Sequence, residues 1–405
     1  MKTKTNHASR LSVPVTRGPA FVRQGNEWAI YQHLLALTPA SSPQLAQSTG
    51  LSKVTTSAAL NNLERLGLVT QTGVRVGSAG RSPRLYAPRA EAGFVVAFDM
   101  GAEWTRGALA DLTGRVVMRQ DRRTPARTTD LIALLAHMVA AMLADHGIEA
   151  DDVLTKVIGS PGVLDVEKGC LRLAGNLPGW EREDLLSQLQ QALGADLIID
   201  NDINLATLGE QKCGAGREVE NFVFMSIGTG VGLGIVAEGK LHRGAGGFAG
   251  EIAMLPPAPD SGTLPPVGAP HRGLYETCAD ARAIVAHAHQ LGLPFASAEA
   301  VFAAADDGDA RAVECVAEEA RQIAWALKAI IPILDPALVV FGGGIGRNSK
   351  LLLPKIRQHL AEFLLIPLPE FAVSTTGTDA VLLGAIEHGL DHARVKAFEQ
   401  RMEQP

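Results

Sequence analysis

One succession of strands occurs twice in this chain and restricts its possible folds more than any other feature. Phe94 to Asp99 is a nearly continuous apolar run, which predicts a buried strand, and further strand candidates follow at 105–111 and 115–120. The same succession begins again 128 residues later, with candidates at 222–227, 231–237 and 240–241. In both copies a glycine turn follows the first strand. The repetition predicts a duplicated α/β unit that binds a ligand in the cleft between its halves.

Other strand candidates also end in tight turns. The candidate at 157–160 runs into Pro161-Gly162, and the candidate at 197–200 delivers Asn201 and Asp202 to a loop. A predicted helix at 317–334 precedes a strand at 337–341 and the glycine-rich turn 342–346. Glycine turns after strands let the backbone approach a phosphate closely, but they are also common in α/β folds without a ligand. Their order along the chain is therefore more informative than any single turn.

The charges are divided unevenly between the beginning of the chain and the rest. Residues 1–90 contain 11 Lys and Arg against two acids, a balance of 11 − 2 = +9. Residues 91–405 contain the other 26 bases and 41 acids, a balance of 26 − 41 = −15. This division predicts a small basic module that meets a polyanion, attached to an acidic body with a different task. The alternative is a chance distribution of solvated charges.

The basic module has the pattern of a winged helix-turn-helix domain at 21–88, preceded by a flexible basic tail at 1–20. Apolar residues at helical spacing predict a supporting helix over 26–37. Ser42-Pro43 predicts the start of a short helix that Gly50 ends, and Ser52 predicts the cap of a second helix. The residues expected to face inward on the second helix are Val54, Ala58, Leu60, Leu63 and Leu66. Two helices joined by a tight turn, behind a third helix, are typical of this motif.

Polar side chains at the start of the second helix predict a DNA-binding surface. The candidates are Lys53, Thr55, Thr56 and Ser57, with Asn61 and Asn62 further along. Short hydroxyls, amides and one lysine can approach base edges and phosphates without a steric clash. The alternative is that these side chains are simply solvated.

A small wing is expected after this helix. Its predicted hairpin has strands at 68–71 and 74–76 around Thr72-Gly73, followed by the basic loop 80–84. Arg81 and Arg84 in this loop are expected to lie along the phosphate backbone or reach into a minor groove.

The composition predicts a protein of the reducing cytoplasm. No run approaches the roughly 18 to 20 apolar residues that a membrane helix needs, and the polar start lacks the apolar stretch of a secretory signal. The four cysteines are widely separated, without C-x-x-C spacing, so neither disulfides nor a cysteine-rich metal site are expected.

The ordered motifs of the acidic body resemble those of the ROK family, which comprises repressors, open reading frames and sugar kinases. The matching motifs are Asp99-Met-Gly101, Ile158-Gly-Ser-Pro-Gly-Val-Leu-Asp165, Asn176-Leu-Pro-Gly-Trp180, Asp200-Asn-Asp-Ile-Asn204, Ile227-Gly-Thr-Gly-Val-Gly232, Arg243-Gly-Ala-Gly-Gly-Phe-Ala-Gly-Glu-Ile252 and Gly342-Gly-Gly344. They cover nearly all of residues 91–395. The N-terminal module matches the winged helix of the family's repressor branch, which the free-standing kinases lack.

The resemblance implies a fold and a ligand site. The implied fold is α/β, an actin-like, sugar-kinase (ribonuclease H-like) domain with a small lobe at 91–205 plus 376–395 and a large lobe at 206–375. The implied sugar site consists of Asn176, Asn201, Asp202, Glu251 and Glu276, with the backbone of Gly162 beside it. Carboxylates and amides of this kind bind sugar hydroxyls. Alternatively, Asn201, Asp202 and Asn204 cap a helix and Glu251 is a solvated loop acid.

Two departures from the family's pattern bear on cofactors. In the kinases the first turn reads Asp-x-Gly-Gly-Thr-Lys or similar and holds nucleotide phosphates. Here Ala102 crowds the turn and Glu103 brings a negative charge towards a polyphosphate, which disfavours ATP binding. The positions of the family's zinc ligands hold Met254, Val267, Ala269 and Leu274, none of which is a usual ligand. We therefore expect no structural zinc; the alternative is a site improvised from His242, His271 and Cys278.

These observations predict a sugar-responsive transcriptional regulator, a repressor of carbohydrate uptake or catabolism genes. Its expected partners are operator DNA, a sugar or sugar-phosphate effector, and further copies of itself in a homodimer or homotetramer, without a membrane partner. The alternative is an ATP-dependent sugar kinase that also binds DNA, in which Asp202, matching the kinases' general base, would be the catalytic residue.

Overall fold

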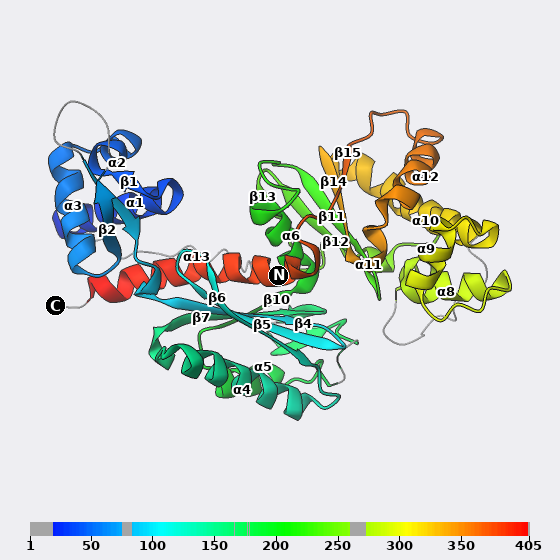
Figure 1. The fold of residues 1–405 in the computed structure, drawn as a ribbon, viewed down its shortest axis with the longest axis horizontal. Coiled ribbons are helices and arrows are strands. Elements are labelled where there is room, and N and C mark those ends of the chain that lie inside the picture. Colours follow the sequence, from blue (N-terminus) through cyan, green and yellow to red (C-terminus); the bar gives the residue numbers. More distant parts are fainter. Residues whose placement is uncertain are drawn as a thin grey trace, which may run out of the picture. The chain divides into compact units, whose positions relative to one another are not determined.

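The computed structural model describes residues 19–74, 83–165, 167–175, 177, 179–259 and 273–403 (Figure 1). Its internal contacts divide the chain into two compact units. Met1–Ala92 and Arg394–Pro405 form unit 1, and Gly93–Ala393 form unit 2. The last residues of the chain therefore belong to the same unit as the first.

Unit 1 combines helices with a small antiparallel sheet. Its helices are α1 (Pro19–Leu37), α2 (Ser42–Thr49) and α3 (Lys53–Arg65), and its strands β1 (Ala40–Ser41), β2 (Val69–Val74) and β3 (Arg84–Pro88) are ordered β1-β3-β2. Helix α2 ends at Gly50, whose left-handed φ of 72° suits glycine. Helix α3 begins after Ser52, whose side chain accepts a hydrogen bond from the Thr55 backbone. Both ends lie where the sequence predicts them.

The wing differs from its prediction. Thr72-Gly73 is not a hairpin turn, because β2 continues through it and pairs with β3, with a register shift between Gln71 and Gly73. Glycine tolerates such a bulge as readily as a turn, so the sequence signal was ambiguous. Arg84 opens β3 instead of lying in the preceding loop, and Arg81 lies outside the described residues.

Helix α3 presents a different face from the one expected. Its buried residues are Thr56, Ala59, Leu60 and Leu63, while Val54 is 80% exposed and Ala58 is also exposed. Leu60 and Leu63 fix the buried stripe, and helical spacing from them brings Thr56 inward. Thr56 donates its hydroxyl to the Ser52 carbonyl at 3.0 Å, so the prediction that it faces DNA is wrong.

The end of the last helix packs inside unit 1. Helix α13 (Ala380–Met402) places the Phe398 ring 4.9 Å from that of Trp28 and 6.3 Å from that of Tyr31, both on α1. Arg401 donates to the carbonyl of Leu66, the residue that caps the end of α3. The core of the winged helix thus includes residues from the far end of the chain.

Unit 2 contains two five-stranded sheets of matching topology. The first has the order β10-β7-β4-β5-β6, and the second has the order β13-β12-β11-β14-β15. In each, an antiparallel meander of three strands is extended by parallel strands beside its first member. The first sheet consists of β4 (Phe94–Met100), β5 (Trp104–Asp111), β6 (Val116–Arg123), β7 (Val153–Ser160) and β10 (Leu197–Asn201). The second consists of β11 (Phe222–Ile227), β12 (Val231–Ala237), β13 (Lys240–Leu241), β14 (Leu338–Gly342) and β15 (Glu370–Val373). The predicted duplication is therefore confirmed.

Each sheet has its own helical cover and apolar core. Helices α4 (Thr128–His146) and α5 (Leu185–Leu193) share one core with the first sheet. The helices that share a core with the second sheet are α7 (Glu276–Ala279), α8 (Ala281–Gln290), α9 (Ala298–Asp306), α10 (Ala310–Leu334), α11 (Gly343–Gly346) and α12 (Ser349–Ala361). The hairpin β8 (Val163–Asp165) and β9 (Cys170–Arg172) and the short 3-10 helices Ala90–Ala92, Ala150–Asp152, Ile252–Met254 and Gly377–Asp379 complete the described elements.

Among the helices that the structure describes, α4 alone is long and apolar enough, by length and composition, to cross a membrane. Its residues Leu135, Met138 and Met142 are fully buried and pack into the core under the first sheet. This packing is that of an ordinary core helix.

Helix α6 (Asp202–Cys213) meets α13 with almost no space between their backbones. A Cβ atom on Gly384 would lie 1.7 Å from the Leu205 carbonyl oxygen, and one on Gly209 would lie 2.3 Å from the Ala380 oxygen. Only glycine permits an approach this close. The helix that begins at Asp202 is thus tightly packed against the helix that continues into unit 1.

Candidate functional site

Unit 2 contains a cleft of about 950 Å³ lined by residues of both halves. One wall includes Pro161 and Gly162 after β7, Asn201 at the end of β10 and Asp202 at the start of α6. The other includes the Gly228–Gly230 turn between β11 and β12, the segment ending at Glu251, and Glu276 at the start of α7. The Gly343–Gly344 turn after β14, the counterpart of β7, also lines the cleft, so turns from both halves of the duplicated unit converge on one cavity.

The structure brings most of the predicted sugar-site residues together. Those that line the cleft are Gly162, Asn201, Asp202, Glu251 and Glu276. Asn176 lies outside the described residues, so its position relative to the cleft stays a prediction.

Asn201 holds the local backbone in place. Its side-chain oxygen accepts hydrogen bonds from the backbone of Ile203 and Asn204, both at 3.0 Å, which caps α6. Its amide nitrogen donates to the Gly162 carbonyl at 3.1 Å and so joins the two turns. Gly162 has a φ of 87° and no room for a Cβ atom, because the Arg172 carbonyl would lie 2.4 Å away. The helix-cap alternative is correct for Asn201, which lines the cleft at the same time.

Asp202 has an electrostatic environment unusual for a carboxyl group. Its carboxylate is packed among protein atoms, although part of the residue faces the cavity. Burial, together with the negative charges of Asp99 and Glu251, raises the pKa of Asp202 to about 7, although the Ile203 backbone donates to it at 2.8 Å. Near neutral pH this group can therefore donate as well as accept a hydrogen bond.

Glu251 and Glu276 form a second acidic wall. Burial, and then the neighbouring charge of Glu276, raises the pKa of Glu251 above its ordinary value. A Cβ atom on Gly230 would lie 3.0 Å from the Glu276 carboxylate, so the glycine turn passes directly beside that carboxylate. Glu251 is half-buried in the cleft wall, which is not the environment of a solvated loop acid.

An ion pair beside this cleft was not foreseen from the sequence. Asp99, at the end of β4, pairs in register with Arg106 of β5, and the guanidinium of Arg106 donates to the Asp99 carboxylate at 2.9 Å. Asp99 is buried, whereas Arg106 also lines the cleft. The sequence signal for this pair was that Asp99 and Arg106 are seven residues apart, on either side of a tight turn. A hairpin of this length places their two side chains on one face of the sheet.

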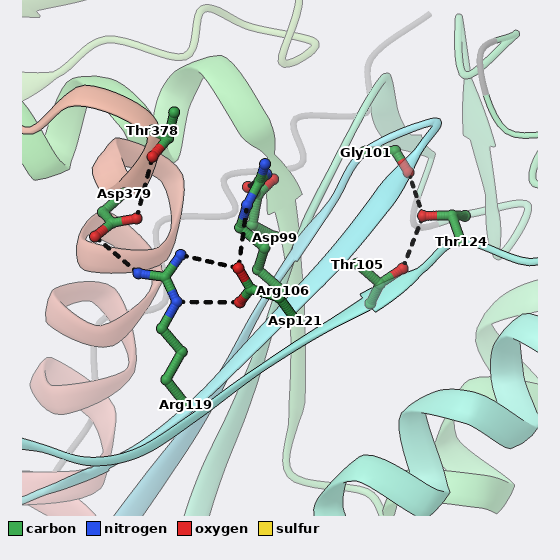
Figure 2. A network of polar contacts seen from close by, with 9 residues as sticks. All are labelled: Asp99, Gly101, Thr105, Arg106, Arg119, Asp121, Thr124, Thr378 and Asp379. Atoms are coloured by element: carbon green, nitrogen blue, oxygen red, sulfur yellow. Dashed lines mark hydrogen bonds and ion pairs between the residues drawn. The ribbon is translucent and has the colours of Figure 1, made fainter.

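Figure 2 shows how this ion pair extends into a network. Arg119 donates to both carboxylate oxygens of Asp121, at 3.0 and 3.2 Å, and lies 2.8 Å from the Asp379 carboxylate (Figure 2). The Arg106 guanidinium lies 3.9 Å from Asp121. Nearby, Thr124 donates to the Gly101 carbonyl at 2.7 Å and holds the turn after β4. The network fixes the orientation in which Arg106 faces the cleft.

Glu103 does not have the position expected for it. Its side chain is 77% exposed and lies 3.3 Å from the Arg123 guanidinium, and it is not among the residues that line the cleft. The charged side chain of this hairpin that does reach the cavity is Arg106. The expected repulsion between Glu103 and a polyphosphate therefore has no structural support.

The candidate DNA-binding residues of unit 1 divide into exposed and occupied positions. Lys53 and Arg84 are exposed, and Ser57 is exposed with its hydroxyl 3.2 Å from that of Ser42. Thr55 is half-buried, and its hydroxyl lies 2.8 Å from that of Ser52, within the cap of α3. Val54 was expected inside but lies on the exposed face beside Lys53. Because Val54 is apolar, the sequence predicted a buried position for it.

Comparison with known proteins identifies the family to which the chain belongs through unit 2. The model of the ROK family matches residues 95–388, most of the chain. The chain belongs to the ROK family. A glucokinase of Halalkalibacterium halodurans is 31% identical over 310 residues, which cover 71% of this chain and 92% of that protein. A xylose repressor of Bacillus subtilis is 26% identical over 385 residues, covering 92% of this chain and 96% of the repressor.

A solved structure extends the likeness to the fold of the whole chain. A ROK family transcriptional regulator, described as a homologue of the Escherichia coli MLC protein, aligns with a TM-score of 0.76 at 22% identity. The alignment covers 94% of this chain and 99% of that structure. The chain therefore has the ROK sugar-kinase fold with an N-terminal helical unit, and its relatives include both repressors and kinases.

The zinc positions of the ROK family do not fit a metal in this chain. Met254 is half-exposed at the cleft and Leu274 is also partly exposed, and neither side chain binds zinc. The other two positions, Val267 and Ala269, lie outside the described residues, as does His271. Within the described part of the chain, which includes His242 and Cys278, no three His, Cys, Asp or Glu side chains are grouped to hold a metal ion.

Proposed function

We propose that this ROK protein is a sugar-responsive transcriptional regulator, most simply a repressor of genes for carbohydrate uptake or catabolism. The observation that carries the proposal is the combination, in one chain, of a winged helix with an exposed polar face on α3 and a cleft walled by carboxyl groups. The likeness to a xylose repressor supports it, because that match covers 92% of the chain and so includes unit 1 residues. A likeness to the glucokinase covers only 71%.

The chemistry of the cleft suits a polyhydroxyl ligand. Asp202, Glu251 and Glu276 line it, and each carboxylate can accept two hydroxyl hydrogen bonds. A site built from such groups discriminates against analogues that lack a hydroxyl, because its buried polar atoms are then left without partners. The proposed effector is a sugar or sugar phosphate, which the protein binds in the cytoplasm.

The chemistry of unit 1 suits DNA. Lys53 and Arg84 can neutralise phosphates, whereas Val54 and Ser57 can contact base edges, Val54 through a thymine methyl group. We propose that a homodimer, or a homotetramer built from dimers, binds a palindromic operator. The two α3 helices must then match half-sites about one DNA turn or a multiple apart. Sugar binding changes the closure of the cleft and thereby this spacing, provided that the sugar favours one conformation.

A titration of DNA binding tests this function. Fluorescence anisotropy of a labelled fragment from the promoter next to the protein's own gene, titrated with monosaccharides and sugar phosphates, should show binding that one of them changes. Thermal-shift screening of the same compounds identifies the effector, since a ligand of the native state raises its apparent stability. Absence of binding to any adjacent promoter at low salt would refute the proposal.

A kinase that also binds DNA is the second candidate. Asp202 stands at the position of the kinases' general base with a pKa of about 7, which suits a base near neutral pH. The glycine turns at Gly228–Gly230 and Gly343–Gly344 line the cleft. Coupled ATP turnover over a panel of sugars, with Asp202→Asn as the control, separates the candidates. Turnover that this substitution abolishes would establish the kinase.

A further inference from the structure

We propose that Asp200 couples the effector cleft to helix α13, and that His388 on α13 receives the signal. The inference rests on the proposed function, because it explains how a ligand in unit 2 is sensed by a helix that extends into unit 1. The Asp200 carboxylate binds Arg243 of a cleft-wall loop and lies 3.9 Å from His388 on α13.

Asp200 lies at the base of the cleft wall. It precedes Asn201 and Asp202 at the end of β10, and its carboxylate accepts a hydrogen bond from the Asn201 backbone at 2.9 Å. Its other oxygen accepts a hydrogen bond from the Arg243 guanidinium at 2.5 Å. The side chain of Asp200 is 11% exposed, whereas that of Arg243 is 39% exposed, so the carboxylate is largely buried while the guanidinium still reaches solvent.

Arg243 begins the segment 243–251, here called the effector loop, which lines the cleft and ends at Glu251. The Ala249 backbone donates to the Arg243 carbonyl at 3.2 Å and so joins the two ends of the loop, while Leu233 of β12 donates to Gly250 at 3.1 Å and holds the loop against the sheet beside Glu251. Gly250 is essential to this arrangement: a Cβ atom there would lie 1.8 Å from the Leu233 carbonyl oxygen. A ligand that moves Glu251 therefore moves the guanidinium of Arg243 as well.

His388 lies near the same carboxylate oxygen that Arg243 binds. Its Nε2 atom is 3.9 Å from the Asp200 oxygen that binds Arg243, too far for a hydrogen bond. The titratable or charged groups that face the ring are Asp200, Arg243, His392 and Asp391. Burial, together with the positive charge of Arg243, lowers the pKa of His388, while Asp200 opposes this.

Two basic groups thus compete for one carboxylate. When Arg243 is paired with Asp200, His388 is kept neutral and at a distance. When the effector loop withdraws Arg243, Asp200 loses its cation, and His388 takes up a proton from solvent and pairs with it. Asp200 cannot form both ion pairs at full strength at the same time. Helix α13 therefore has two preferred positions, one for each pairing.

Helix α13 is suited to pass such a shift along its length. Near its start, Gly384 contacts the backbone of α6, the helix that begins at Asp202. Asp379, directly before α13, is held by Arg119 of the network in Figure 2. Its last turns carry Phe398 against Trp28 of α1 and Arg401 against the end of α3. A displacement at His388 therefore reaches residues that support the recognition helix.

The first test separates the binding of the sugar from its effect on operator affinity. In the full chain, His388→Ala should change the dissociation constants for sugar and, without sugar, for operator by less than threefold. The sugar-dependent change in operator affinity should fall at least fivefold. His137→Ala is the matched control, since this histidine is exposed on α4 and should retain the full response. A full response in His388→Ala would overturn the proposal.

The second test needs neither operator nor effector. Imidazole NMR signals, with that of His388 assigned through His388→Gln, should show that Arg243→Ala raises the pKa of His388. Arg282→Ala, which removes the partly exposed cation of another pair with a buried aspartate in unit 2, should leave it unchanged. An unchanged pKa in Arg243→Ala refutes the coupling even if DNA regulation is confirmed. A raised pKa in a protein that no sugar releases from DNA supports the coupling and refutes the proposed function instead.

Discussion

Arg106 and Asp99 face each other across the β4–β5 ladder and form an ion pair of 2.9 Å at the edge of the cleft. Asp99 is buried, and burial raises its pKa while the Arg106 guanidinium lowers it. The pair therefore contributes to stability mainly because loss of Arg106 would leave the Asp99 carboxylate buried without a cation. A buried carboxylate without its cation is far more costly than an exposed one.

We expect Arg106→Gln to lower the free energy of unfolding by about 3 kcal/mol, the lower end of the range for a broken buried pair, because the guanidinium also reaches the cleft. The double variant Arg106→Gln, Asp99→Asn should recover much of this loss, since it removes the stranded charge. Urea denaturation at pH 7 measures both. A loss below about 1 kcal/mol would show that the pair behaves like a surface ion pair.

The raised pKa of Asp202 predicts a pH-dependent stability. Because the folded protein holds a proton on this group up to about pH 7, it binds more protons than the unfolded chain between the ordinary carboxyl pKa and that value. The free energy of unfolding contributed by Asp202 is therefore present at low pH and lost as the pH rises towards 7. Asp202→Asn should flatten this slope. Thermal unfolding between pH 5 and 8 measures it, and identical slopes in both proteins would contradict the assignment.

The close approach of α6 and α13 predicts opposite effects of one substitution at two helical glycines. Gly384→Ala should destabilise unit 2 by at least about 2 kcal/mol, because the added methyl group overlaps the Leu205 carbonyl and the helices must separate. Gly25→Ala, in α1, adds a methyl group with nothing within 4 Å and should stabilise unit 1 by about 0.5 to 1 kcal/mol. Chemical denaturation followed by hydrogen exchange assigns each effect to its unit.

The exposed face of α3 predicts which substitutions alter DNA binding. Lys53→Ala and Arg84→Ala should weaken binding to all sequences and each reduce the salt dependence by about one released counterion. Val54→Ala and Ser57→Ala should instead change the preferred operator sequence. Operator affinities measured over a range of salt concentrations distinguish the two effects. Equal weakening of specific and random DNA by Val54→Ala would place that side chain away from the bases.

Thr56 provides a contrasting prediction for the same helix. Because it is fully buried and hydrogen-bonded to Ser52, Thr56→Val should leave the operator preference unchanged and alter only the stability of unit 1. A changed preference would mean that α3 is rotated from its position here.

The strands of the two meanders, with β7, β10 and β14, were predictable because most are short apolar runs bounded by turn residues, whereas the short strands β8, β9 and β15 were not predicted. The second meander agrees residue for residue, from β11 to β13, since its glycine turns leave little choice of boundary. The cleft followed from the same turns. It was their order along the chain, and not any single motif, that indicated which loops would converge.

The errors arose where side chains compete for one face. Val54 is apolar and Thr56 polar, so hydropathy alone reverses them, whereas the leucines one and two turns further along set the helix phase. Arg106 was missed because its partner becomes evident only from the register of two strands. Helix α13 has apolar residues on several faces, because it packs against both units, and this conceals its periodicity.

The placement of Arg394–Pro405 in unit 1 has a consequence for moving this unit between proteins. The N-terminal residues transferred alone would lack Phe398 and Arg401, which complete the packing around α1 and α3. Exchanging unit 1 between two ROK proteins of this architecture should therefore succeed only when the final turns of the last helix are exchanged with it.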